Sequence, residues 1–150
     1  MQARMKNPVL VLPDALKALI ALSEAATSTG IDPNLVPMVL LRASQINGCG
    51  VCVDMHWKAL RKAGESDERI FGVAAWRDMT YFTDVERAAL ALTESATRLA
   101  DRPDAVTDEV WNDVARLFSE EQLAALVISI AAINAWNRLN ATTRQVVGSF

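Results

Sequence analysis

The sequence is poor in the residues that most often carry catalysis or bind metals. It has one histidine and two cysteines among 150 residues, and all three lie within residues 44–56, SQINGCGVCVDMH. There is no second CxxC pair to complete a four-ligand zinc site, so a fourth ligand would have to be a carboxylate or water. The question is whether Cys49, Cys52 and His56 form a redox site, ligate a metal or only fill a core.

The sequence also lacks a long apolar run and a cluster of basic residues. The most apolar stretch, residues 123–136, has 14 residues, whereas a membrane span needs roughly 20. Pro13, Asp14 and Lys17 interrupt the apolar part of the N-terminal segment, so we expect no secretory signal. A net charge of −3 with scattered Lys and Arg argues against nucleic-acid binding. We therefore expect a cytoplasmic protein whose cysteines are thiols with redox or metal chemistry.

The composition is that of a folded chain. Hydrophobic residues make up 51% and charged residues 22%, with only 6 glycines and 5 prolines. A chain of this length most simply forms one domain, residues 1–150, with a real core. The balance is slightly apolar for a monomer, which indicates that some apolar surface is buried between subunits.

The hydrophobic pattern predicts helices almost throughout, and no segment alternates like a strand for long enough. Ser66 is expected to cap a helix, and Thr83 with Glu86 and Ser119 with Gln122 fit the capping box. The expected helices cover residues 13–30, 32–48, about 50–63, 66–76, 83–100, 107–118 and 119–141. The sequence thus predicts an all-α, single-domain fold of about six or seven helices.

The cysteine pair is expected to open a helix after the Asn47-Gly48 break. At about 100° per residue, Cys49, Cys52 and His56 share one helix face with apolar residues, while Lys58 and its charged neighbours lie opposite. That face should point into protein. Three ligands on one rigid helix cannot surround a tetrahedral ion, which makes a self-contained metal site a poor third alternative.

A helix start suits thiol chemistry, because free backbone N–H groups and the helix dipole stabilise a thiolate. Cysteines at i and i+3 can close a disulfide, and His56, one turn beyond Cys52, can take or return a proton. The alternative is that the cysteines are small core residues beside a buried, satisfied histidine. On the last helix, Asn134 and Asn137 are expected to form structural hydrogen bonds to a loop, such as the one before Cys49.

Three segments resemble the alkylhydroperoxidase D-like, or carboxymuconolactone decarboxylase, superfamily. They are LRASQINGCGVCVDMHWKALRKAG (41–64), ERIFGVAAWRDMTYFTDVERAALALTESAT (68–97) and FSEEQLAALVISIAAINAWNRLN (118–140). The similarity covers residues 33–141, and its most specific parts are the Asn-Gly-Cys-x-x-Cys-x-x-x-His core and the late INAWNR.

The resemblance implies an all-helical homo-oligomer, often a trimer or hexamer, with peroxidase activity at the CxxC pair. We expect no cofactor and no metal. The resemblance also implies that Cys52 meets the hydroperoxide with the help of His56. Cys49 would then form the disulfide and be the more open to a reductant. A lipoyl-bearing or thioredoxin-like protein would supply the reducing thiols. The branch that decarboxylates a lactone does not depend on a CxxC pair.

One departure from the family pattern affects the expected proton relay. Well-known members carry a glutamate twelve residues before the first cysteine, where this chain has Pro37, and can carry a histidine where it has Val51. We expect Glu86 to be the first candidate for the missing acid, although it also fits the capping box with Thr83. The sequence therefore predicts a thiol-dependent peroxidase or disulfide reductase. The alternative is a non-enzymatic helical homo-oligomer with redox-sensing or structural thiols.

Overall fold

The helices begin and end close to where the caps and breaks predict. The computed structural model describes residues 2–26, 29–101 and 103–148, and within these ranges it contains helices and no strand. In chain order the elements are α1 (Pro8–Val11), α2 (Pro13–Ala25), α3 (Leu35–Asn47), α4 (Gly50–Lys62), α5 (Asp67–Gly72), the 3-10 helix η1 (Val73–Asp78), α6 (Asp84–Thr97), α7 (Asp108–Leu117) and α8 (Glu120–Thr142). The expected all-α fold is confirmed.

Side-chain caps explain the helix starts. Thr83 and Glu86 form the predicted capping box of α6, and Ser119 and Gln122 form that of α8. Ser66 accepts the backbone N–H of Arg69 and caps α5.

Two helices near the N-terminus differ from the expected ones. The single turn of α1, capped by Asn7, is too short to produce a recognisable hydrophobic period. Helix α2 ends at Ala25, before the expected stop at Gly30, and residues 27–28 of the expected helix lie outside the described residues.

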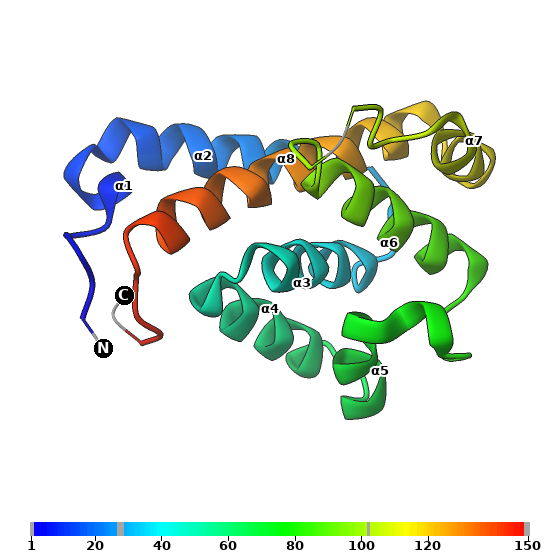
Figure 1. Ribbon diagram of the computed structural model, residues 1–150, viewed down its shortest axis with the longest axis horizontal. Coiled ribbons are helices and arrows are strands. Elements are labelled where there is room, and N and C mark those ends of the chain that lie inside the picture. The colour runs from blue at the N-terminus through cyan, green and yellow to red at the C-terminus, as the bar shows by residue number, and fades with distance from the viewer. Residues whose placement is uncertain (1, 27–28, 102, 149–150) are drawn as a thin grey trace.

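Helix α3 lies at the centre of the fold (Figure 1). It packs against α4, α6 and α8, and its buried side chains include Met38, Val39 and Leu41. Because α3 ends at Asn47, just before the cysteine motif, this central packing fixes the position from which α4 starts.

The two ends of the chain lie side by side (Figure 1). The backbone N–H of Arg4 donates to the carbonyl of Thr143 at 2.9 Å, and Nε2 of Gln145 donates to the carbonyl of Met5 at 3.0 Å. These bonds hold the N-terminal segment against the last turn of α8. Nowhere in the described ranges is a helix both long and apolar enough to cross a membrane.

Candidate functional site

The turn between α3 and α4 places both cysteines. Gly48 ends α3 with φ of 66°, a left-handed conformation that glycine adopts without a steric penalty. The backbone N–H of Cys49 then donates to the carbonyl of Ser44 at 3.0 Å. Cys49 becomes the N-cap of α4, with its Sγ accepting the backbone N–H of Cys52 at 3.4 Å. The predicted helix start at the motif is confirmed.

Cys49 and Cys52 form a disulfide, with their Cα atoms 5.4 Å apart. Both are buried, with 2% and 1% of their surface exposed. Burial therefore hardly distinguishes the two, and the expected greater openness of Cys49 to a reductant stays a prediction.

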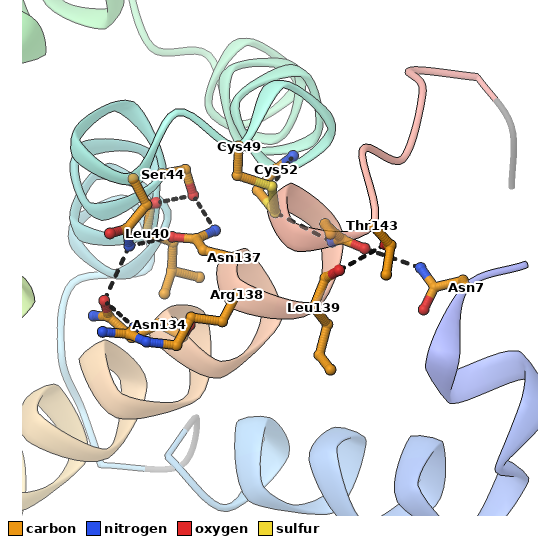
Figure 2. Close-up of a disulfide and its surroundings, with 12 residues drawn as sticks. Asn7, Leu40, Ser44, Cys49, Cys52, Asn134, Asn137, Arg138, Leu139 and Thr143 are labelled. Carbon is orange, nitrogen blue, oxygen red and sulfur yellow. Dashed lines mark hydrogen bonds between the residues drawn. A yellow bond between two sulfur atoms is a disulfide. The ribbon is translucent and has the colours of Figure 1, made fainter. Parts of the chain in front are cut away.

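Three asparagines join the end of α3 to α8, and Figure 2 shows two of them, Asn134 and Asn137, on α8. Nδ2 of Asn47 donates to Oδ1 of Asn134 at 3.0 Å and to Oδ1 of Asn137 at 2.9 Å. Nδ2 of Asn137 donates in turn to Oγ of Ser44 at 3.1 Å. The expected bonds from the last helix to the residues before Cys49 are confirmed, and they fix the backbone that leads into the motif.

His56 lies on the same buried face of α4 as Cys52 and Leu60, as the helical phase predicts. Burial lowers the pKa of His56 from 6.5 to about 4, so the imidazole is neutral at pH 7. Its Nε2 is buried and has no hydrogen-bond partner among the described residues. The neutral imidazole therefore lies on the face of α4 that carries Cys52, where one ring nitrogen can act as a transient proton acceptor during a reaction.

A cavity of about 570 Å³ opens onto this face of α4. Cys52 and His56 are part of its wall, whereas Cys49 is not among the described lining residues. Most of the remaining wall is apolar and comes from α2, α3, α4 and α8, including Leu16, Ile20, Val36, Leu40, Met55 and Trp136. Asn7, Ser23, Glu24, Ser129 and Asn140 add polar atoms. The arrangement presents one sulfur of the disulfide and one neutral base to an apolar space.

Comparison with known sequences places this site in a family. The sequence model of the carboxymuconolactone decarboxylase family matches residues 13–95, which include the whole CxxCxxxH motif. The chain belongs to this family. The uncharacterized protein YdfG of Bacillus subtilis is 33% identical over 130 residues, which are 87% of each chain.

Another relative matches only a short part of the chain. The alkyl hydroperoxide reductase AhpD of Bradyrhizobium diazoefficiens is 44% identical over 41 residues, 27% of this chain and 22% of that one.

Two solved structures share the fold of this chain. A protein of unknown function from Agrobacterium tumefaciens superposes with a TM-score of 0.90 at 33% identity, over 99% of this chain and 100% of the other. The debrominase Bmp8 superposes with a TM-score of 0.80 at 21% identity, over 92% of this chain and 73% of its own. The fold of the family therefore supports more than one chemistry.

Glu86 does not lie with the cysteines. It closes the capping box with Thr83 at the start of α6, pairs with Arg69 of α5, and is not among the lining residues of the cavity. Its surroundings account fully for a structural role and give no support to the expected role in a proton relay. Pro37, at the position where the resemblance implied a glutamate, lies in the first turn of α3.

No group of three or more His, Cys, Asp or Glu side chains within the described ranges is arranged to hold a metal ion. The sequence reasoning also missed two residues at the site, Asn140 and Asn7. Asn140 lies one turn beyond Asn137 on the same helix, a spacing that could have pointed to it, but Asn7 offers no sequence signal.

The low pKa of His56 predicts a specific acid sensitivity. In the unfolded chain His56 binds a proton near pH 6.5, but in the folded protein it does so only near pH 4, so falling pH favours unfolding. Between pH 7 and pH 5 this one group should reduce the free energy of unfolding by about 2 kcal/mol. Urea unfolding of the oxidised protein at both pH values measures the loss.

His56→Gln is the matched control, because glutamine does not titrate and all other acid-sensitive groups are unchanged. The stability of the variant should fall less than that of the wild type between pH 7 and pH 5. Equal losses in the two proteins would show that His56 is not held neutral by burial.

Proposed function

We propose that this chain is a thiol-dependent peroxidase that reduces organic hydroperoxides and is regenerated by a dithiol. One observation carries the proposal: Cys52 and the neutral His56 form part of the wall of the apolar cavity, and Cys49 lies directly behind within disulfide distance. A nucleophile, a base and a second thiol are the groups that the reaction needs.

The chemistry balances with these three residues. His56 takes the proton of the Cys52 thiol, and the thiolate attacks the terminal oxygen of the hydroperoxide. The O–O bond breaks, Cys52 becomes a sulfenic acid, and the leaving alkoxide takes the proton from His56 to give an alcohol. The Cys49 thiol then displaces the hydroxyl of the sulfenic acid as water, and the disulfide forms.

The cavity wall favours an organic substrate over hydrogen peroxide. An apolar group gains from leaving water for an apolar wall, by about 25 cal/mol for each Å² buried. Hydrogen peroxide has no such group and would gain nothing from the side chains of Leu16, Ile20 and Trp136 that line the space. The polar end of the substrate would point to Cys52.

The comparisons support a peroxidase within a family of several reactions. The AhpD relative carries the name of an alkyl hydroperoxide reductase, whereas Bmp8 is a debrominase on the same fold. Lactone decarboxylation, which gives the family its name, does not use a dithiol, so it would leave no part for a buried CxxC pair of which Cys52 faces the cavity.

The proposal includes two kinds of partner, a reducing dithiol and further copies of this chain. Each cycle consumes two electrons, which we propose come from a lipoyl-bearing or thioredoxin-like dithiol. We also propose a homo-oligomer, because α1, α2 and the residue between them expose large apolar side chains, Leu10, Val11, Leu12, Ile20 and Leu22. Light scattering of the purified protein gives its mass.

Thiol counting tests the peroxidase chemistry. Fully reduced protein should lose both free thiols when it is mixed with one equivalent of cumene hydroperoxide, and adding a dithiol should produce continuous peroxide loss. Both thiols surviving prolonged exposure would overturn the proposal. A single round of oxidation without steady-state peroxide loss would instead favour a redox sensor, the non-enzymatic alternative.

A further inference from the structure

A directional chain of hydrogen bonds ends on the sulfur of Cys52. Nδ2 of Asn140, near the end of α8, donates to Sγ of Cys52 at 3.4 Å. Oδ1 of Asn140 accepts a bond from Nδ2 of Asn7 at 2.9 Å, and Oδ1 of Asn7 accepts the backbone N–H of Val9 at 3.2 Å. Figure 2 shows Asn7 reaching toward this end of α8. Each amide is thereby oriented by the one before it.

Neither side-chain amide can easily rotate so that its oxygen and nitrogen exchange places. Asn7 and Asn140 are 3% and 7% exposed, so a reversed amide would leave its groups unsatisfied away from water. Because the oxygen of Asn7 is occupied by the N–H of Val9, its nitrogen faces Asn140. The oxygen of Asn140 must then face Asn7, and its N–H is left to face Cys52.

No side chain in the described part of the cavity wall carries a positive charge at neutral pH before the reaction begins. The titratable side chains there, apart from Cys52 itself, are Glu24 on α2 and the neutral His56 on α4. On the helices packed against α4, Arg42 of α3 binds Glu94 and Arg138 of α8 binds Asn134. The oriented N–H of Asn140 is therefore a fixed side-chain donor placed to stabilise negative charge on this sulfur.

We propose that Asn140 stabilises the Cys52 thiolate by donating this hydrogen bond, and that Asn7 is a positioning residue that keeps the donor end of Asn140 on the sulfur. The inference rests on the proposed function only in taking Cys52 as the cysteine that reacts. Cys49 has its own donor, the backbone N–H of Cys52. Both asparagines lie outside residues 13–95, the part of the chain that matches the family.

The pH dependence of alkylation tests the proposal without any peroxide. The measurement uses reduced protein with Cys49→Ser, so that Cys52 is the only thiol, and serine remains a good helix cap. The rate of reaction with iodoacetamide is followed from pH 5 to pH 10. Its midpoint should rise by about 1 to 2 pH units in Asn140→Leu. The free energy of a hydrogen bond to a charged group corresponds to a pKa shift of about this size.

Two further variants separate orientation from structure. Asn7→Ser keeps a side chain able to cap α1 but is too short to reach Asn140, and should shift the midpoint upward by less than Asn140→Leu does. Gln145→Ala removes another bond between the chain ends, the one to Met5, without touching the asparagine pair. Its midpoint should match that of the parent.

Each possible result decides one part of the proposal. An unchanged midpoint in a folded Asn140→Leu protein would overturn the proposal, and an unchanged midpoint in Asn7→Ser would overturn the role of Asn7. Asn140→Ala, which adds no bulk, replaces the leucine variant if that does not fold. Peroxide consumption by the wild type is measured alongside. If it is absent while the midpoint still shifts, the peroxidase assignment fails and the stabilisation of the thiolate stands.

Discussion

Cys52→Ser is expected to abolish turnover of an organic hydroperoxide, by about a thousandfold or more. Cys52 is the cysteine that lines the cavity, and a serine hydroxyl at this position stays protonated near neutral pH and cannot attack the O–O bond. The change from sulfur to oxygen is small enough to leave the packing between α3, α4 and α8 intact. Steady-state peroxide loss with excess dithiol measures the effect.

Cys49→Ser is the matched control, because it makes the same chemical change one turn away. This variant keeps Cys52 and should consume about one equivalent of hydroperoxide, stopping at the sulfenic acid because no thiol remains to close the disulfide. A dimedone adduct on Cys52, detected by mass spectrometry, identifies that product. Wild-type turnover by a folded Cys52→Ser protein would contradict the roles given to the two cysteines.

Glu94→Ala is expected to reduce the free energy of unfolding by about 3 to 5 kcal/mol, the usual effect of breaking a buried ion pair. Glu94 on α6 is 5% exposed. Its Oε1 accepts bonds from Nε of Arg42 at 2.8 Å and from Nε1 of Trp76 at 2.9 Å, while Arg77 pairs with the other oxygen. Alanine would remove the carboxylate that pairs with the partly buried guanidinium of Arg42 and would leave the buried indole N–H of Trp76 without this acceptor.

The pKa of Glu94 depends on both its burial and its hydrogen bonds. Burial works to raise it, but hydrogen bonds from Arg77, Trp76 and Arg42 outweigh burial and hold the pKa below its usual value. The carboxylate therefore stabilises the fold at neutral pH, and this contribution is lost as the pH falls through the lowered pKa.

Arg98→Ala is the control for the Glu94 network. Arg98 lies 4.0 Å from the same carboxylate, but its side chain is 46% exposed. Its loss should change stability by less than about 1 kcal/mol. Urea unfolding of the three proteins at pH 7 gives the comparison. A loss in Glu94→Ala no larger than that in Arg98→Ala would show that the buried pairs contribute little.

The helices and the cysteine motif could be predicted because their causes are local. Capping boxes at Thr83 and Ser119, the Asn47-Gly48 break and the helical phase of Cys52 and His56 depend on residues within a few positions of each other. The expected hydrogen bonds of Asn134 and Asn137 could also be foreseen, because amides on an apolar helix must find a partner.

Glu86 shows where such reasoning is ambiguous. Two roles fitted the sequence, a relay acid and the partner of Thr83 in a capping box. The capping box depends on a three-residue spacing and is present, whereas a place beside the cysteines would require α6 to bring the carboxylate to the cavity. Instead, Glu86 pairs with Arg69, which lies seventeen residues earlier in the chain and is not part of the cavity wall.

By itself, therefore, the sequence determined an all-helical chain with a CxxC pair at a helix start and a histidine on the same buried face. Only the tertiary structure decided what surrounds them: the apolar cavity, the Asn7–Asn140 bond across 133 positions and the buried Glu94 network. The physical reason is distance along the chain. Caps and helical phase act over a few residues, whereas a cavity wall and a buried amide pair exist only once separate helices have packed together.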